Sequence, residues 1–204
     1  MNRAAQGLIF AGLAVGMAAS LQAQDAAPRT HAVELTLAAG FFQPTGTSGT
    51  TGGSTPILLT RRPAPAGSLH LSFNPPSGVF AVDFSGGYAP EGLRQQAAGA
   101  AGKSHTNLSF ASAKLMIGRS PRKPGVSYLI GAGFGIEHRK KSVLDPAVSA
   151  TNAGPAVSAM IRIPIDGQVG LRLDAEDLIY QADWGYGKKT RNDFILSAGL
   201  SIAW

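Results

Sequence analysis

The chain has 204 residues, with 18 Lys and Arg against 12 Asp and Glu, 26 Gly and no Cys. The absence of Cys excludes a disulfide framework, a thiolate metal site and a lipid-modified N-terminal Cys. The net charge of +6 is scattered, and no aromatic stacking platform accompanies the basic residues, so nucleic-acid binding is not expected.

The first residues have the pattern of a secretory signal peptide. A short basic start, Met1 to Arg3, precedes an apolar run from Gly7 to Ala18, and this run is too short to span a bilayer. Ala23 then supplies a small residue at the expected cleavage position. We therefore expect residues 1–23 to be a cleaved signal peptide and residues 24–204 to form a single domain. A retained N-terminal anchor helix is the alternative.

Eight later segments alternate, with every second residue apolar and the residues between them small or polar. A period of two predicts strands with two different faces. The predicted strands cover residues 33–41, 68–73, 79–88, 107–118, 126–137, 157–165, 169–176 and 194–204. An even number of strands is what a bacterial transmembrane barrel requires.

The fourth segment changes phase along its length. Leu108 and Phe110 lie on one face, whereas Leu115 and Ile117 lie on the other. A β-bulge near residues 111–113 would bring all four onto the same face.

The hairpin between the sixth and seventh segments also has a predictable register. A loop of three residues, Asp166, Gly167 and Gln168, would pair Ile165 with Val169 and keep both on the apolar face.

The connections between the predicted strands are of two kinds. Three are short turns, at residues 74–78, 119–125 and 166–168. Four are longer and rich in Gly, Ser, Thr, Ala and Lys, at residues 43–67, 89–105, 139–154 and 183–193. Short and long connections alternate strictly, as they do in membrane barrels with short periplasmic turns. The sequence therefore predicts an all-β fold, a transmembrane antiparallel up-and-down β-barrel of eight strands with both termini in the periplasm.

Aromatic residues indicate that the apolar face contacts lipid. Two girdles are predicted, one at the loop end (Phe41, Tyr88, Phe110, Tyr180, Trp184 and Phe194) and one at the turn end (Phe73, Phe80, Tyr128 and Trp204). The last strand, from residue 194 to 204, would cover roughly 25 Å of membrane at about 3.3 Å per residue and a tilt of about 40°. A soluble lipocalin-like barrel is the alternative.

The signal peptide, the alternating strands and the terminal segment Leu196 to Trp204 together resemble the small outer-membrane β-barrel proteins of the OmpA/OmpX type. The resemblance covers essentially the whole chain after the signal. It implies that Leu200, Ile202 and Trp204 belong to a C-terminal signal that the barrel-assembly machinery recognises. No peptidoglycan-binding domain follows Trp204, so we expect a barrel without a periplasmic domain.

The face opposite the apolar one carries charges that would lie in the lumen: Glu34, Asp83, Arg162, Arg172, Asp174 and Glu176. In the predicted register the two arginines face one another, which is unfavourable unless acids approach them. Glu137 could also supply such an acid. Because barrels of about eight strands are filled by side chains, we expect a salt-bridged lumen plug. A functional ion path is the alternative.

The histidines do not form a recognisable catalytic or metal-binding pattern. His70 and Ser72 are similar to part of the arrangement in outer-membrane lipid A deacylases, but they would face the lumen and no adjacent acid is evident in the sequence. His105 and His138 lack metal-ligand spacing and are expected to be solvated near loop ends. We expect no catalytic residues, no metal and no cofactor.

Basic residues cluster in the predicted loops: Arg61, Arg62, Arg139, Lys140, Lys141, Lys188, Lys189 and Arg191. They could meet phosphates of lipopolysaccharide, although solvated loop side chains are the more ordinary interpretation. The leading hypothesis is a monomeric, non-enzymatic outer-membrane protein with a structural or surface-interaction role among outer-membrane lipids. A narrow porin-like channel comes second, and a lipid A-modifying enzyme third.

Overall fold

The computed structural model describes residues 33–45, 48–50, 57–61, 63–75, 79–97, 104–119, 125–139, 151–183 and 188–204. The described residues form ten strands: β1 (Val33–Thr45), β2 (Ser48–Thr50), β3 (Ile57–Arg61), β4 (Ala64–Phe73), β5 (Phe80–Ala97), β6 (Ser104–Arg119), β7 (Ser127–Arg139), β8 (Thr151–Asp166), β9 (Val169–Asp183) and β10 (Lys188–Ala203). None of the described residues belongs to a helix that could cross a membrane. The predicted signal peptide and its cleavage position lie outside these residues.

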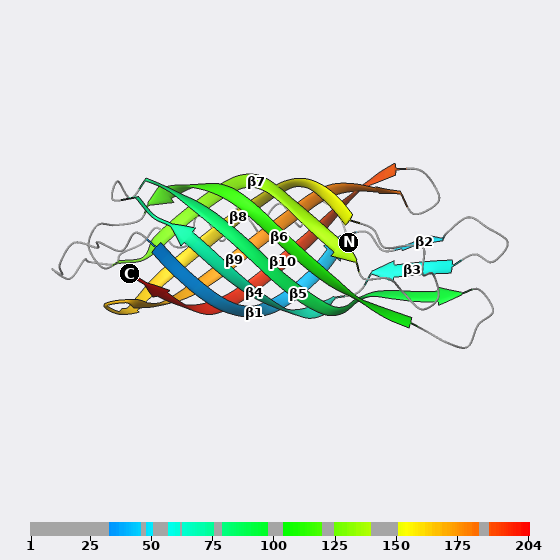
Figure 1. The fold of residues 1–204 in the computed structure, drawn as a ribbon, viewed down its shortest axis with the longest axis horizontal. Helices are drawn as coiled ribbons and strands as arrows, with labels where there is room; N and C mark the ends of the chain where they lie inside the picture. The colour runs from blue at the N-terminus through cyan, green and yellow to red at the C-terminus, as the bar shows by residue number, and fades with distance from the viewer. Residues whose placement is uncertain are drawn as a thin grey trace, which may run out of the picture.

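Eight of the strands close into an antiparallel up-and-down barrel (Figure 1). Each strand from β4 to β9 pairs with the next, and β1 pairs with both β4 and β10. β2 and β3 extend the sheet at one end, where β3 pairs with the last residues of β5. Closure leaves the eight barrel strands without a free edge, which a membrane-spanning sheet requires. The predicted eight-stranded barrel is confirmed, whereas the periplasmic position of the termini stays a prediction.

Several strands continue beyond their apolar pattern at the loop end. β5 runs to Ala97, β8 begins at Thr151, β9 reaches Asp183 and β10 begins at Lys188. The predicted loops are correspondingly shorter. Pairing of backbone groups does not require apolar side chains, so a strand that leaves the apolar band can continue with polar residues on both faces.

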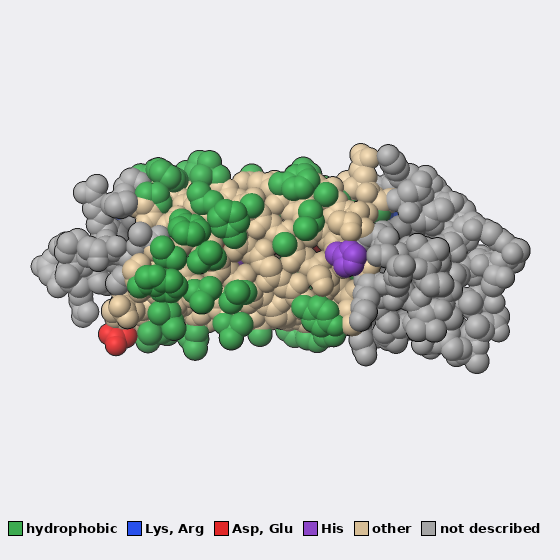
Figure 2. Space-filling view, viewed as in Figure 1, with side chains coloured by type: hydrophobic (Ala, Val, Ile, Leu, Met, Phe, Trp, Pro, Cys, Tyr) green, Lys and Arg blue, Asp and Glu red, His purple; other side chains and the backbone are tan. Residues whose placement is uncertain are grey.

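The outer surface of the barrel is apolar. Leu37 and Ile130 are 72% and 70% exposed, and Figure 2 shows hydrophobic side chains spread over the visible face of the barrel. The turn-end aromatics Phe73, Phe80, Tyr128 and Trp204 lie on this surface, as do Phe41 and Tyr88 at the loop end, with Phe194 partly exposed. So much exposed apolar area is typical of a surface that meets lipid.

Two predicted members of the loop-end girdle do not belong to it. Phe110 and Tyr180 point into the barrel and are only 6% and 2% exposed. Trp184 lies outside the described residues. The prediction was wrong for Phe110 and Tyr180 because an apolar side chain on a barrel strand can fill the lumen as well as face lipid.

The predicted bulge in the fourth segment is absent. β6 keeps one register with β7 across residues 108–119, and the irregularity in its pairing with β5 lies between Ala89 and Leu93. Leu108 points inward like Phe110, whereas Leu115 is exposed outside. The apolar pattern changes face because the lumen itself becomes apolar at this level.

The hairpin between β8 and β9 has a two-residue turn in place of the predicted three. Asp166 pairs with Val169 across Gly167 and Gln168, and the Asp166 carboxylate accepts a hydrogen bond from the Gly167 N–H at 2.8 Å. A register shift just before the turn absorbs the extra residue. Ile165 and Val169 consequently both lie outside, as predicted.

Candidate functional site in the barrel lumen

The structure places all six predicted lumen charges inside the barrel: Glu34, Asp83, Arg162, Arg172, Asp174 and Glu176 are each less than 9% exposed. Alternation is the cause, because inward positions on β9 fall at every second residue and therefore carry Arg172, Asp174 and Glu176 in succession. The other three charges come from β1, β5 and β8. Together these strands surround the lumen.

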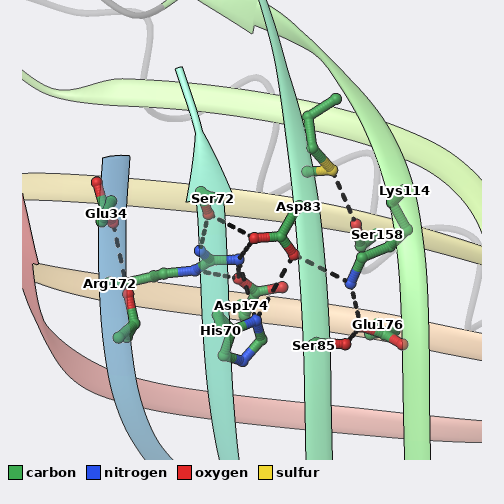
Figure 3. Close-up of polar contacts among 12 residues, drawn as sticks. Glu34, His70, Ser72, Asp83, Ser85, Lys114, Ser158, Arg172, Asp174 and Glu176 are labelled. Atoms are coloured by element: carbon green, nitrogen blue, oxygen red, sulfur yellow. Dashed lines mark hydrogen bonds and ion pairs between the residues drawn. The ribbon is translucent and has the colours of Figure 1, made fainter. Parts of the chain in front are cut away.

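Arg172 is the centre of the network (Figure 3). Its guanidinium donates to the Asp174 carboxylate at 2.6 Å, to Ser72 Oγ at 2.7 Å and to His70 Nδ1 at 3.1 Å, and it lies 3.0 Å from Asp83 Oδ1. Ser72 in turn donates to Asp83 Oδ1 at 2.5 Å. Arg172 thus connects β9 with β4 and β5 through a side chain that is 1% exposed.

Arg162 forms a second ion pair. It faces Arg172 across the β8–β9 ladder, as the predicted register required. Its Nε lies 2.9 Å from Glu34 Oε2 on β1. Gly170 leaves room for this contact, since a Cβ at that position would lie 3.1 Å from Arg162 Nε and 2.9 Å from Ser201 Oγ.

Lys114 on β6 completes the network and was missed in the sequence. It forms an ion pair with Glu176, and its Nζ lies 3.4 Å from Asp83 Oδ2. Ser85 adds a hydrogen bond to Glu176 Oε2 at 3.2 Å. The alternation with the outward-facing Leu115 already placed Lys114 on the inner face, and this was the signal that could have found it.

Apolar side chains point into the lumen on the loop side of these charges. One cluster, contributed by β1, β4, β5, β6 and β10, contains Phe42, Ala64, Ala66, Ala89, Leu108, Phe110 and Ile195. A second joins Ala156, Leu178, Tyr180 and Ala182 of β8 and β9. On β9 the inward side chains change from Glu176 to Leu178, so the apolar layer follows directly on the charged one.

A separate polar group lies nearer the loop end of the barrel. Glu137 and Arg139 contact one another at 3.7 Å, and Tyr180 donates to Asp193 at 3.0 Å. The suggestion that Glu137 reaches the lumen arginines was therefore wrong, because it lies two residues from the end of β7 and pairs there.

The predicted loop basic patches are also partly wrong. Arg139 and Arg191 lie in strands with side chains that are 2% and 8% exposed, so they are not solvated loop residues. The backbones of Arg61, Lys188 and Lys189 likewise belong to strands. Arg62, Lys140 and Lys141 lie outside the described residues. The strands extend further into these polar segments than alternation could reveal.

The structure supplies the acid that the sequence did not show beside His70 and Ser72. Asp83 binds Ser72 and lies 3.6 Å from His70 Nδ1. However, His70 Nε2 contacts Ser68 Oγ at 3.1 Å instead of Ser72, and Arg172 donates to Nδ1. Both ring nitrogens of His70 are therefore occupied by other partners, and Ser72 donates to the Asp83 carboxylate, not to a histidine.

The remaining histidine that can be placed lies outside the barrel. His138 is exposed, and its Nδ1 lies 3.0 Å from Thr151 Oγ1. Among the described residues, no group of three or more His, Asp or Glu side chains is arranged to hold a metal ion. The side chain of His105 lies outside the described part of the chain.

Solved structures with the same architecture are found by comparison, although no family model and no curated protein sequence matches the chain. The outer-membrane protein OprG from Pseudomonas aeruginosa is 9% identical and matches with a TM-score of 0.56, covering 85% of this chain and 97% of its own. The chain has the fold of a small outer-membrane β-barrel. The outer-membrane protein AlkL in lipid bilayers (16% identity, 92% and 97% coverage, TM-score 0.49) and Neisserial surface protein A (14%, 85% and 97%, 0.48) are also similar.

The predicted C-terminal assembly residues lie at the end of β10. Leu200, Ile202 and Trp204 are all more than half exposed on the outer face of the barrel. Trp204 exchanges backbone hydrogen bonds with Val33, so the last strand remains paired with β1 up to the end of the chain.

Proposed function

We propose that the protein is an integral outer-membrane β-barrel, exported with residues 1–23 as a cleaved signal, whose lumen is closed and whose role is structural or interactive and not enzymatic. The observation that carries this proposal is the buried ion-pair network centred on Arg172, which links β9 to β4, β5 and β6 across the lumen.

The outer surface supports a position in the membrane. In water, its exposed side chains would each cost about 25 cal/mol for every Å² of apolar surface. Aromatic residues flank this apolar surface at both ends, as in barrels whose edges lie at the two membrane interfaces. Lipid is therefore the solvent that best suits the outside of this barrel.

The interior supports closure of the lumen. Solutes crossing it would have to break contacts such as Arg172–Asp174 and Lys114–Glu176 and then pass the layer that contains Phe42 and Phe110. Separating buried ion pairs costs several kcal/mol unless the charges are solvated again. Such a lumen favours a structural barrel over a general diffusion pore.

Conductance measurements test the closed lumen. Purified folded protein is inserted into planar bilayers in concentrated KCl, and a porin of known conductance serves as the positive control. We expect no stable current steps from this protein. Regular steps at every insertion would contradict closure and favour the narrow porin-like channel, for which the small inward residues Ser197, Gly199 and Ser201 are the supporting feature.

The membrane location has its own test. Envelope fractions are separated, and the protein is run on gels with and without heating. We expect it in the outer-membrane fraction with a heat-dependent change in migration, as a folded barrel shows. Recovery in the soluble fraction without heat-modifiable migration would contradict the proposal.

We propose no catalytic role, because Ser72 is held by Asp83 and Arg172 and lacks a contact with His70 Nε2. Mass spectra of lipid A that change on expression, and revert in a Ser72→Ala variant, would contradict this. The expected partners are outer-membrane lipids, lipopolysaccharide and the barrel-assembly machinery, which would recognise Leu200, Ile202 and Trp204. The proposed state is a monomer.

A further inference from the structure

The lumen network carries more negative than positive groups. Among the described side chains it contains four carboxylates, Glu34, Asp83, Asp174 and Glu176, and three permanent cations, Lys114, Arg162 and Arg172. Nearer the loop end, the buried charges among the described residues are Glu137 and Asp193 with Arg139 and Arg191, equal in number. An uncompensated charge in a buried site is costly, so one further positive charge would stabilise the network.

His70 is the titratable group placed to supply that charge. It is 3% exposed and lies on β4 between β1 and β5. The charged groups on the elements around it are Glu34 on β1, Asp83 on β5, Lys114 on β6, and Arg172, Asp174 and Glu176 on β9. Histidine is the side chain that ordinarily changes its charge between about pH 5 and 8.

The surroundings of His70 Nδ1 offer two different partners. Arg172 Nη2 lies 3.1 Å away and Asp83 Oδ2 lies 3.6 Å away. Arginine can only donate a hydrogen bond, so its contact requires an unprotonated Nδ1. Once Nδ1 carries a proton it can no longer accept from Arg172, and it can donate to Asp83. Asp83 Oδ2 is buried and accepts no hydrogen bond in the neutral arrangement, although Lys114 Nζ lies 3.4 Å from it.

We propose that His70 is an acid-operated switch in the lumen network: one proton from solvent binds the Nδ1 lone pair, replaces the Arg172–His70 bond with a His70–Asp83 bond and balances the network charge. No covalent bond other than the new N–H forms or breaks. Nε2 keeps its proton and its contact with Ser68 Oγ in both states. Arg172 retains its contacts with Asp83 Oδ1 and Asp174.

Nitrogen NMR of the folded barrel in lipid tests this proposal between pH 8 and pH 5.5. We expect the His70 ring signals to change from the neutral to the imidazolium pattern, and the Arg172 side-chain signals to shift over the same pH range. In His70→Gln the Arg172 shift should be lost. His138→Gln is the matched control, because His138 is exposed on the outside, and the Arg172 shift should be unchanged there.

Two results would overturn the proposal. One is a His70 signal in the wild-type barrel that keeps its neutral pattern throughout this range, which needs no variant to fold. The other is an Arg172 shift in His70→Gln equal to that of the wild type. None of these results depends on whether the lumen conducts.

Discussion

Replacement of Arg172 by Met is the sharpest test of the lumen network. Met replaces the apolar stem of the Arg side chain but has no hydrogen-bond donor, so the variant leaves Asp83, Asp174, Ser72 and His70 without their shared partner. Each bond to a charged group is worth about 1.5–3 kcal/mol. Lys114, which lies 3.4 Å from Asp83, can replace part of the lost charge. The expected loss in the free energy of unfolding is therefore about 3–5 kcal/mol, as for other broken buried ion pairs.

Urea unfolding of the barrel in lipid vesicles measures this loss, with the heat-modifiable gel shift as the readout of the folded fraction. Arg119→Met is the control, because Arg119 is exposed at the turn end, and we expect a change of less than about 0.5 kcal/mol there. A triple variant that combines Arg172→Met with Asp83→Asn and Asp174→Asn should recover at least half of the stability, since neutral side chains no longer need the guanidinium. An Arg172→Met barrel within about 0.5 kcal/mol of the wild type would refute the reasoning.

Three further changes test other parts of the barrel by the same unfolding assay. Gly170→Ala should lower the free energy of unfolding by about 1–3 kcal/mol, because its Cβ would lie 2.9 Å from Ser201 Oγ. Gly67→Ala is the control, and it should cost less than about 0.5 kcal/mol because the atom nearest to its Cβ lies at 4.0 Å. Equal effects of the two substitutions would contradict the packing around Gly170. Phe110→Ala should cost about 3–5 kcal/mol if the apolar layer is well packed, and a loss below about 1 kcal/mol would show that it is not. Leu200→Arg, in the middle of the apolar outer surface, should cost about 2–4 kcal/mol of unfolding free energy in lipid. Gln43→Arg, at the loop end of that surface, should cost about 0–1 kcal/mol. The reverse order would mean that the lipid boundary lies elsewhere on the barrel.

The barrel could be predicted because its two faces meet different surroundings. Leu196, Ala198 and Leu200 alternate with Ser197 and Gly199, and a strand with one face in lipid and the other in a polar lumen must alternate in this way. The same argument placed Arg162 opposite Arg172, and the structure has that pairing. It failed at Leu108 and Phe110, where the lumen is itself apolar and the two faces no longer differ.

The strand ends could not be predicted for a related reason. Outside the apolar band both faces of a strand are polar, so the ladders of β8 and β10 continue into residues that read as loop. Arg139 and Arg191 were consequently assigned to solvent when they are buried. The turn after Asp166 shows the same limit. A two-residue turn with a bulge before it, and a three-residue loop without a bulge, both leave Ile165 and Val169 on the outer face, so alternation cannot distinguish them.

The sequence by itself determined the number of barrel strands, their order along the chain and the inward face of the six predicted lumen charges, because all three follow from local alternation and from the turns between strands. Only the tertiary structure decided which charges meet. Arg172 contacts His70 and Ser72, about a hundred positions away in the chain, because closure of β1 onto β10 brings β9 across the lumen from β4. Alternation specifies a direction for each side chain, and the distance across the barrel depends on how all eight strands are staggered.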